Sequence, residues 1–261
     1  MVLRGLLSSL GVYGIYHRWL RYQIRSGKNP DHIGVILDGN RRWATAHDLN
    51  PWEGHYYGAE KVKDFLKWCL DLNIKTVTLY LFSTENFQRS KKEVDEIMKV
   101  GQSYLDWVRD DETMQKYRVR IKVLGRISML PENIQQAIKE IEDMTKDYDN
   151  YYLNLAIAYG GRAEIVDAAK QITKMAIDKK INPDDIDEAL FEKYLYTSHL
   201  PHQDPDIIIR TSGESRLSGF LLWQSAYSEF CFMDVYWPGF RQIDLERAIR
   251  TYQRRERRYG I

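Results

Sequence analysis

Several common functional motifs are absent from this chain of 261 residues, and cysteine is scarce. Cys69 and Cys231 are its only cysteines, too few for a disulfide scaffold or a cysteine-rich zinc site, and this usage is typical of a reducing cytoplasm. The sequence has no GxxxxGKS/T loop, no GxGxxG after a predicted strand and no HExxH pattern. An ordinary nucleotide-dependent enzyme and a common type of metallohydrolase are therefore disfavoured, and we expect a cytoplasmic protein.

A large net charge of either sign is also absent, because 38 Lys and Arg residues nearly balance 37 Asp and Glu residues. No overall field would attract nucleic acid, so we expect no nucleic-acid partner, and any anion site must be local. With 44% hydrophobic residues the chain is able to bury a substantial core. We expect residues 32–261 to form one large domain, preceded by an extension of residues 1–31.

The amino-terminal region lacks a stretch long enough to cross a membrane. The uncharged interval between Arg4 and His17 contains two serines and falls short of the roughly 20 apolar residues that a spanning helix needs. It has no convincing small-residue cleavage site, so a secretory signal is not expected. Apolar residues at three- and four-residue steps instead predict an amphipathic helix: Leu3, Leu6, Leu7, Leu10, Tyr13, Tyr16, Leu20 and Ile24.

This amphipathic helix has two possible roles. Arg18, Arg21 and Arg25 share a face that differs from the apolar one. The helix either packs on the body of the protein or on a partner, or it lies in a membrane interface with its arginines near anionic headgroups. Residues 1–28 are therefore a candidate for association with a membrane surface.

Short apolar runs alternate with helical patterns along the rest of the chain. The runs are rich in β-branched or aromatic residues and predict strands at 33–37, 76–82, 119–124, 153–158, 206–209 and 230–235. Apolar residues with helical spacing lie between them, at 60–70, 93–108, 134–141 and 165–172. This alternation predicts an α/β fold with a central, mostly parallel six-stranded sheet flanked by helices. In such a fold, ligands bind beyond the carboxyl ends of the strands.

Polar clusters follow four of the predicted strands. They read DGNRRWA at 38–44, STENFQR at 83–89, YGGR at 159–162 and RTSGESR at 210–216. The arginines that they bring to the carboxyl edge include Arg42, Arg89, Arg210 and Arg216. Guanidinium groups bind phosphate oxygens in a bidentate manner, and these four exceed what one phosphate requires. The clusters indicate a site for a diphosphate, or for two.

Two carboxylates are candidates for binding a metal ion. Asp38 is either the salt-bridge partner of neighbouring arginines or a ligand of Mg²⁺, which takes one or two carboxylates together with phosphate oxygens. Glu229, just before the last predicted strand, is the other candidate. The acidic run 184–187 follows Asn182 and Pro183 and is better explained as helix-capping and first-turn residues.

An apolar region lies next to these clusters in the predicted sheet. Its strand residues are Leu79, Leu81, Leu153 and Leu155, and the helices at 60–70 and 93–108 are expected to flank them. These side chains either form ordinary core or line an apolar tunnel beneath the diphosphate site. A tunnel would suit an isoprenoid chain.

Six segments in collinear order together resemble the cis-prenyltransferase family, the undecaprenyl and dehydrodolichyl diphosphate synthases. They are HIGVILDGNRRWA, GHYYGAEK, LYLFSTENFQRS, NLAIAYGGR, DIIIRTSGESRLSGFLLWQSAYSEF and RRERRYG. DGNRR, ENFQRSK and SGESRLSGFLLWQ look closer to archaeal and eukaryotic members. The resemblance implies a six-stranded fold with an apolar tunnel and an Mg²⁺-dependent enzyme that adds isopentenyl diphosphate repeatedly to an allylic diphosphate, with farnesyl or geranylgeranyl diphosphate as primer. Each new double bond would be cis, and the product would be a medium or long polyprenyl diphosphate for a glycosyl carrier lipid.

The resemblance also implies roles for individual residues. It places Asp38, Asn40 and Asn86 in the catalytic set, with Asp38 at the allylic diphosphate and its metal; the base that removes the proton is left open. Substrate-binding positions follow from the same motifs: Gly39, Arg41, Arg42, Trp43, His55, Phe87, Arg89, Arg210, Arg216 and Ser218. Arg210, Arg216 and Ser218 match the isopentenyl diphosphate pocket, and Glu229 matches the carboxylate that shares its magnesium.

Some positions depart from the family pattern. Pro51 stands where many relatives carry an arginine, a contact for which Arg41 is a possible replacement, and Leu81 stands where some long-chain members have a small residue. Some relatives are non-catalytic partner subunits, and others make short products or use a different acceptor. Because the chain also has the Arg258 and Gly260 ending that completes a neighbour's site in such pairs, we expect a self-sufficient homodimer.

Overall fold

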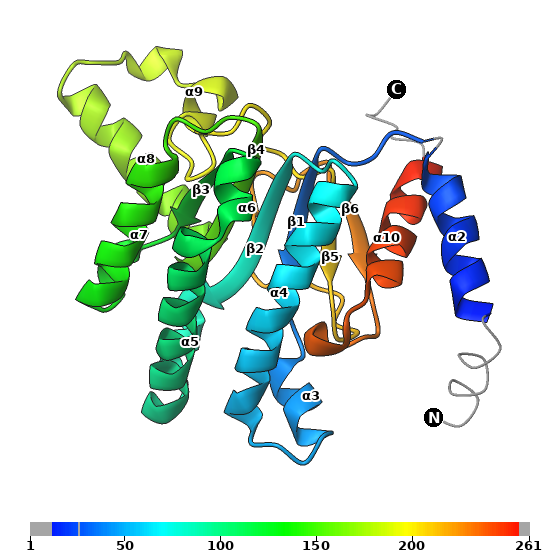
Figure 1. Cartoon of the computed structure of the whole chain (residues 1–261). Coiled ribbons are helices and arrows are strands. Elements are labelled where there is room, and N and C mark those ends of the chain that lie inside the picture. Colours follow the sequence, from blue (N-terminus) through cyan, green and yellow to red (C-terminus); the bar gives the residue numbers. More distant parts are fainter. Residues whose placement is uncertain (1–11, 26, 256–261) are drawn as a thin grey trace.

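A single parallel sheet forms the centre of the molecule (Figure 1). In this computed structural model, which describes residues 12–25 and 27–255, the strands are β1 (His32–Ile36), β2 (Thr76–Ser83), β3 (Val119–Leu124), β4 (Tyr151–Tyr159), β5 (Ile207–Arg210) and β6 (Glu229–Phe232). Their order is β3-β4-β2-β1-β5-β6, and every pairing is parallel. The predicted α/β fold with six strands is confirmed.

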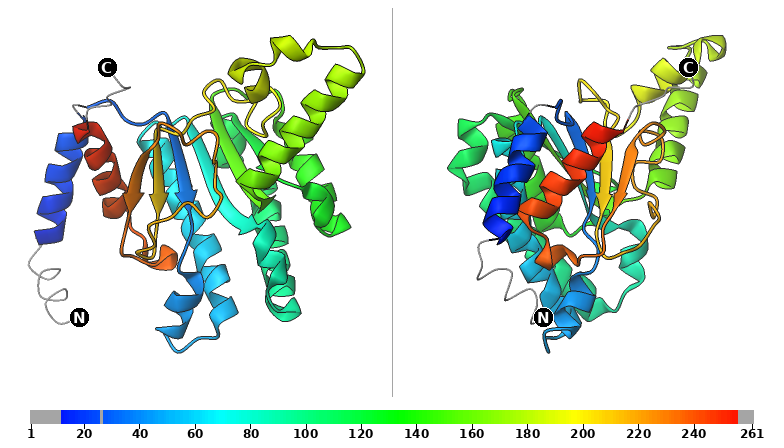
Figure 2. Two further views of the ribbon diagram at one scale, coloured as in Figure 1. Left: turned by 180° about the vertical axis from the view of Figure 1, so that it is seen from behind. Right: turned by 90° about the vertical axis from the view of Figure 1, so that its right-hand side faces the viewer.

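Helices cover both faces of this sheet (Figures 1 and 2). Their bounds are α2 (Val12–Arg25), α3 (Asn40–Thr45), α4 (Gly54–Asp71), α5 (Lys91–Asp110), α6 (Glu112–Lys116), α7 (Glu132–Thr145), α8 (Gly161–Ile177), α9 (Glu188–Glu192) and α10 (Gln242–Arg254). Helices α4, α5, α7 and α10 lie on one face, and α8 lies on the other. The four helical patterns in the sequence correspond to α4, α5, α7 and α8.

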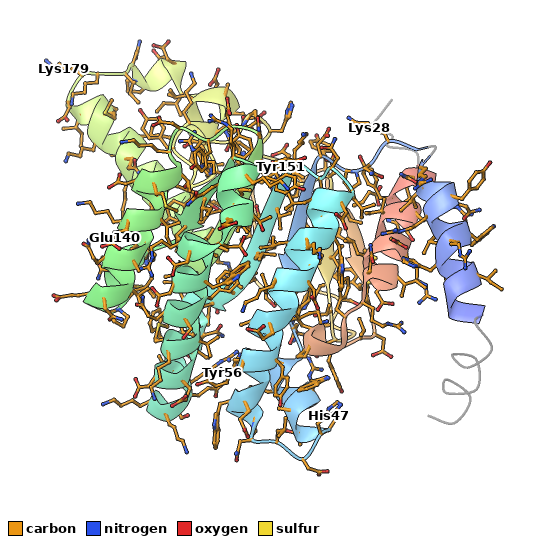
Figure 3. All side chains as sticks on the ribbon, in the orientation of Figure 1. Lys28, His47, Tyr56, Glu140, Tyr151 and Lys179 are labelled. Atoms are coloured by element: carbon orange, nitrogen blue, oxygen red, sulfur yellow. The ribbon has the colours of Figure 1, made fainter. Side chains whose placement is uncertain are left out.

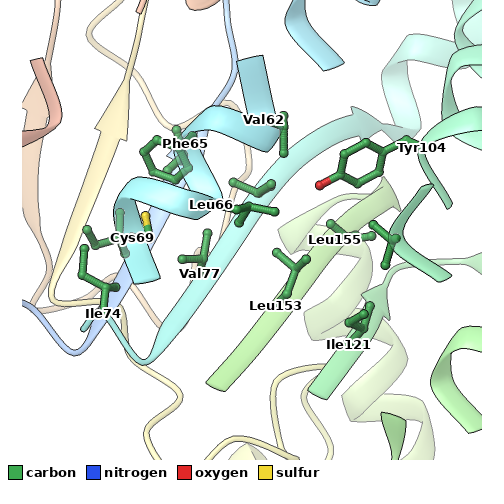
Figure 4. Packing of buried hydrophobic residues seen from close by; sticks show 14 of the residues in the cluster. Val62, Phe65, Leu66, Cys69, Ile74, Val77, Tyr104, Ile121, Leu153 and Leu155 are labelled. Atoms are coloured by element: carbon green, nitrogen blue, oxygen red, sulfur yellow. The ribbon is translucent and has the colours of Figure 1, made fainter. Parts of the chain in front are cut away.

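The alternation of side chains along the strands produces two cores, one on each face. Val35 and Leu79 belong to the larger core, beneath α4 and α5, while their neighbours Ile36 and Tyr80 belong to the smaller core. On α4, residues at three- and four-residue steps point onto the sheet, as Figure 4 shows for Val62, Phe65, Leu66 and Cys69. The central strands β1 and β5 are thus buried on both faces, as parallel sheets require, whereas the edge strand β6 is partly exposed.

The last strand is shorter than predicted. The sequence pattern extends to residue 235, but β6 ends at Phe232. The loop after β5 has positive φ angles at Ser212 and Gly213, which turn the backbone away from the strand direction. The chain beyond Phe232 then bonds to this loop, with the Ser212 amide donating to the Val235 carbonyl at 2.7 Å. The regular ladder therefore stops where the loop around the site begins.

Helix α2 packs beside α10, as both views show (Figures 1 and 2). Leu20 and Ile24 are buried in the main core. His17 and Arg21 each lie 2.9 Å from the fully buried Glu246 carboxylate of α10, which ties the helix to the body. The predicted apolar residues Leu3, Leu6, Leu7 and Leu10 lie outside the described residues, and the division at residue 31 stays a prediction. Within the described chain, we find no helix with the length and apolarity to cross a bilayer.

A row of buried polar side chains, joined by hydrogen bonds, crosses the middle of the sheet. His32 Nε2 lies 2.8 Å from Thr78 Oγ1, which also accepts from Asn154 Nδ2 at 2.9 Å. His199 Nε2 lies 2.9 Å from the other amide atom, Asn154 Oδ1. Burial lowers the pKa of both His32 and His199 to about 4, so both imidazoles are neutral in the native protein near pH 7.

Acid is therefore expected to destabilise the protein. An unfolded histidine binds a proton below its ordinary pKa of 6.5, whereas native His32 does so only near 4. Stability is thus full above pH 6.5 and falls as the pH drops towards 4, by roughly 3 kcal/mol for a group as buried as His32. Urea unfolding at pH 7, 5.5 and 4.5 measures this change. His32→Asn should flatten the pH dependence and exposed His47→Asn should not; equal stability of the wild type at pH 7 and 4.5 would contradict the prediction.

Candidate active site

A large cleft lies at the carboxyl edge of the sheet, with a volume of about 1350 Å³. Figure 3 shows His47 and Tyr56 at this end of the molecule, and Lys28 and Tyr151 at the opposite end. All four predicted polar clusters contribute to its lining, which includes Asp38, Arg42, Arg89, Arg162 and Arg210. The prediction that these clusters meet at one edge is therefore confirmed.

Asp38 occupies the end of β1, between two arginines. Its Oδ2 accepts from Arg210 Nη2 at 2.7 Å, and its Oδ1 accepts from Arg42 Nη2 at 3.2 Å. Burial acts to raise the pKa of the Asp38 carboxyl, but the hydrogen bond and charge of Arg210 and the charge of Arg42 outweigh it and hold this pKa below its ordinary value. Asp38 is therefore ionised and able to bind a cation.

Gly39 has a backbone that other residues would not tolerate here. Its φ is 99°, and a Cβ atom at this position would lie 2.7 Å from the ring of Tyr236 and 3.0 Å from Ser212. This close packing joins the start of α3 to the loop after β5. It places Arg42, on the first turn of α3, where its Nη2 donates to Ser212 Oγ at 2.7 Å.

Arg210 organises the loop that follows β5. Only 4% of its side chain is exposed. Besides Asp38 it contacts Ser218 Oγ, at 2.8 Å from its Nη1, and the backbone carbonyl of Arg216. The Arg216 side chain turns instead to Glu214 and is not part of the cleft lining. One buried guanidinium thus connects the Asp38 carboxylate to the predicted isopentenyl diphosphate loop.

A second group of charges surrounds Glu93, near the start of α5. Its carboxylate accepts from Arg89 Nη1 at 2.9 Å, and lies 3.6 Å from His55 Nε2 and 3.7 Å from Arg41 Nη1. Burial, together with the charge of Arg89, lowers the pKa of His55 to about 4. The imidazole is therefore neutral near pH 7. Glu93 was missed by the sequence interpretation, although the spacing from Ser90 is that of a helix-capping pattern.

The two asparagines of the predicted catalytic set serve local structure in different ways. Asn86 Oδ1 accepts from the Ser83 amide at 3.0 Å and so holds the turn after β2. Asn40 Nδ2 donates to the Leu37 carbonyl at 3.3 Å, while its Oδ1 is buried without a partner.

Unpartnered buried atoms gather at the cleft. Among the described residues, Asn40 Oδ1, His55 Nε2 and Arg210 Nε are buried without a hydrogen-bond partner, and all three residues line the cleft. Buried polar groups in native proteins are nearly always hydrogen-bonded. Arg210 Nε is a donor and His55 Nε2 is able to act as one, so an anionic ligand would satisfy both, whereas Asn40 Oδ1 is an acceptor and would need a donor.

Three predicted contact residues lie outside the cleft lining within this chain. Trp43 stacks on His47 with ring centroids 4.1 Å apart, and Phe87 packs edge-on against Phe82 at 4.8 Å. Both aromatics are used in packing, and Arg216 pairs with Glu214 as described above. Their positions in the motifs did not reveal which way the side chains point.

Glu229 lies at the wrong edge of the sheet to share a metal ion with Asp38 in the same chain. It pairs with Ile207 at the start of β5, which in turn neighbours Ile33 of β1. Asp38 is five residues beyond Ile33, roughly 16 Å further along the strand direction. A strand's first residue faces the amino edge of a parallel sheet, and here Glu229 contacts Arg255 instead. Within one chain the structure therefore separates Glu229 from Asp38, and the metal role of each residue stays a prediction.

A smaller, apolar cavity of about 100 Å³ adjoins the cleft beneath α4 and α5. The two spaces share lining residues, among them Asn40, His55, Leu81 and Ile97, so the cavity continues from the cleft. Leu81 was one of four leucines predicted to line a tunnel. The other three, Leu79, Leu153 and Leu155, are fully or nearly fully buried members of the main core.

A parallel sheet with arginines and an aspartate at its carboxyl edge, above an apolar cavity, is an arrangement suited to a polyanionic group attached to an apolar chain. Residues 36–260 match the family described as "Putative undecaprenyl diphosphate synthase". The chain therefore belongs to the undecaprenyl diphosphate synthase, or cis-prenyltransferase, family of enzymes.

Proteins of known sequence and structure support this assignment. Over 254 residues the chain is 50% identical to a tritrans,polycis-undecaprenyl-diphosphate synthase (geranylgeranyl-diphosphate specific) of Methanocaldococcus jannaschii, covering 97% of this chain and 91% of that one. A synthase of the same name from Thermococcus kodakarensis is 49% identical, covering 95% and 94%. Lavandulyl diphosphate synthase from Lavandula x intermedia, solved with dimethylallyl diphosphate, superposes with a TM-score of 0.85 at 37% identity, covering 89% and 99%.

Proposed function

We propose that the protein condenses isopentenyl diphosphate repeatedly onto geranylgeranyl diphosphate, forming cis double bonds and a polyprenyl diphosphate of about undecaprenyl length. The observation that carries this proposal is the Asp38, Arg42 and Arg210 arrangement in a cleft that continues into an apolar cavity. The choice of primer and product rests on the names of the archaeal relatives. Such a product would serve as a glycosyl carrier lipid.

The residues of the cleft suit the separation of charge in this reaction. Condensation breaks the bond between the allylic carbon and the diphosphate oxygen, so negative charge grows on the departing diphosphate. Arg42 and Arg89 line the cleft and would stabilise this charge. Asp38 would hold Mg²⁺, since its carboxylate is ionised and Mg²⁺ needs only one or two carboxylates besides phosphate oxygens; the ion, when bound, would neutralise part of that charge.

Positioning of the two substrates would make the second contribution to the rate of condensation. Arg210 and Ser218, held 2.8 Å apart, would bind the diphosphate of isopentenyl diphosphate beside the allylic carbon. The neutral His55, with an unpartnered Nε2, would donate to or accept from an oxygen of the allylic diphosphate. The group that removes the proton after condensation stays open, with the released diphosphate as one base.

Incubation with radiolabelled isopentenyl diphosphate, Mg²⁺ and C10, C15 or C20 allylic diphosphates tests the proposal. We expect incorporation to be fastest with the C20 primer and to stop on chelation with EDTA. Sizing of the dephosphorylated products distinguishes repeated condensation from a short product. Absence of incorporation with every primer by the purified protein would favour the rival role of a non-catalytic partner subunit.

The predicted homodimer also remains to be measured. Arg258 and Gly260, expected to reach the neighbouring site, lie outside the described residues. Sedimentation of the purified protein would give the stoichiometry, and removal of residues 256–261 should lower condensation if the neighbour's tail completes the site.

Membrane association would use the outer face of α2. Ile15, Trp19 and Tyr22 are 68%, 46% and 77% exposed and follow one another at helical spacing, with exposed Arg18 and Arg25 nearby. We expect the Ile15→Ser, Trp19→Ser, Tyr22→Ser variant to bind anionic liposomes at least about tenfold more weakly. Exposed Ile177→Ser, on α8, is the matched control. If the triple variant and the wild type cosediment equally with the liposomes, α2 serves only to pack on the body of the protein.

A further inference from the structure

The loop around Ser218 has a strained backbone. Ser218 and Leu221 have φ angles of 49° and 44°, in the left-handed region that residues with a Cβ atom rarely adopt, and Gly219 between them has a φ of 80°. Such conformations cost free energy and persist only where surrounding contacts hold them. Ser218 is a predicted contact of isopentenyl diphosphate, so the groups that hold this loop bear on substrate binding.

Three donors from different elements hold the loop. The Gly161 amide at the start of α8 donates to the Gly219 carbonyl at 2.7 Å, and Arg210 Nη1 at the end of β5 donates to Ser218 Oγ at 2.8 Å. The third donor is the hydroxyl of Tyr80 on β2, which donates to the Ser218 carbonyl at 3.2 Å. Ser218 is thus held through its side chain by Arg210 and through its carbonyl by Tyr80.

The register of the sheet explains why these two side chains meet at one loop. Tyr80 pairs with Ile36 of β1, and Ile36 pairs in turn with Arg210, so the three residues form one row across β2, β1 and β5. Tyr80 and Ile36 belong to the smaller core. Arg210 lies two residues after Ile208, which belongs to the same core, so its side chain leaves the sheet on the same face.

Packing of the ring fixes the direction of the Tyr80 hydroxyl. The ring stacks on Phe220 with centroids 4.9 Å apart and meets Tyr159 edge-on at 5.8 Å. Only 9% of Tyr80 is exposed, yet the residue lines the cleft. Burial raises the pKa of the Tyr80 hydroxyl above its ordinary value, so the group stays protonated and is able to donate. Phenylalanine would pack in the same way, and the bond to the loop is what the tyrosine adds.

We propose that Tyr80 is a positioning residue for isopentenyl diphosphate, which holds the Ser218 hydroxyl where the diphosphate of this substrate binds. The inference rests on the proposed function. Without the Tyr80 hydroxyl, the Ser218 carbonyl loses this donor and the loop relaxes from its strained backbone. His55 and Arg89, on the allylic side of the cleft, have Glu93 as their partner. The loss should therefore affect isopentenyl diphosphate and spare the allylic substrate.

Steady-state kinetics with the C20 primer test this role. Tyr80→Phe removes one oxygen atom, and we expect KM for isopentenyl diphosphate to rise about tenfold, while KM for geranylgeranyl diphosphate stays within about twofold. Tyr196→Phe is the matched control, because the Tyr196 hydroxyl donates to Asp167 at 2.6 Å and Tyr196 lies outside the cleft lining. It should leave both KM values within about twofold. Unchanged values in Tyr80→Phe, or an equal rise for both substrates, would overturn the proposal.

A double variant shows whether Tyr80 acts through Ser218. Ser218→Ala removes the hydroxyl that Tyr80 positions, and by itself it should raise KM for isopentenyl diphosphate about tenfold. Adding Tyr80→Phe to Ser218→Ala should then change this KM by less than about threefold, because the hydroxyl to be positioned is already gone. A further rise of about tenfold in the double variant would show that the two residues act independently, which contradicts the proposal.

Calorimetric titration with isopentenyl diphosphate and Mg²⁺, without an allylic primer, provides a readout that needs no turnover. The dissociation constant should rise about tenfold in Tyr80→Phe and stay within about twofold in Tyr196→Phe. Weaker binding by Tyr80→Phe, in a protein that shows no condensation with any primer, would refute the proposed function and keep the positioning role. Normal condensation with an unchanged dissociation constant in Tyr80→Phe would refute the positioning role and keep the proposed function.

Discussion

Asp38→Ala is expected to lower the rate of isopentenyl diphosphate condensation by at least about 10³-fold, a loss of roughly 4 kcal/mol of transition-state stabilisation. The cleft has two carboxylates in its described lining, Asp38 and Glu85, and only Asp38 lies between two of the arginines. Its removal takes away the proposed Mg²⁺ ligand and one contact each of Arg42 and Arg210. Initial rates at saturating Mg²⁺ measure the loss.

The fold should survive this substitution. Arg210 loses its carboxylate partner but keeps its contacts with Ser218 and the Arg216 carbonyl. Circular dichroism and thermal melting would verify the folded state. Asp38→Asn is the sharper variant, because it keeps the size and an acceptor oxygen while it removes the charge. Full activity of Asp38→Asn would show that neither metal binding nor charge at this position is needed.

Arg210→Ala is expected to have the second largest effect, a decrease of about 10³-fold in kcat/KM for isopentenyl diphosphate. The guanidinium has three protein contacts in the structure, with Asp38, Ser218 and the backbone of Arg216. Loss of the side chain would free the loop after β5 and leave Asp38 with Arg42 as its remaining partner. Stability should fall by about 2 kcal/mol, less than for a fully buried pair because Asp38 is partly exposed.

Arg210→Lys separates charge from geometry. Lysine keeps the positive charge but lacks the planar fork that joins the carboxylate to the loop, so we expect a decrease of about 10²-fold. Arg126→Ala is the control, since Arg126 pairs with Asp167 at 2.9 Å and lies outside the cleft lining. It should retain condensation within about twofold. Near wild-type activity in Arg210→Lys would limit the role of Arg210 to charge alone.

Much of the site was predictable because its residues follow strands. Asp38 and Arg210 lie at or just after the ends of apolar runs, Arg89 closes the polar cluster that follows another run, and parallel strands bring their carboxyl ends to one edge. Glu229 shows the limit of this reasoning, since it precedes its strand and therefore lies at the opposite edge. Trp43 and Phe87 show another limit, because a motif position does not specify whether a side chain faces a ligand or its neighbours.

Glu93 could be evaluated only in the folded chain. Glu93 lies four residues after Arg89, which precedes α5, but its approach to His55 and Arg41 joins segments about 40 to 50 residues apart.

The sequence by itself determined the alternation of strands and helices, the parallel sheet and the edge at which the charged clusters meet, because hydrophobic periodicity and chain direction are local properties. The tertiary structure alone decided which charges pair, which polar atoms stay without partners and where the apolar cavity ends. These features depend on side chains from distant segments meeting at distances of a few ångströms, and that placement is set by the packing of the whole core.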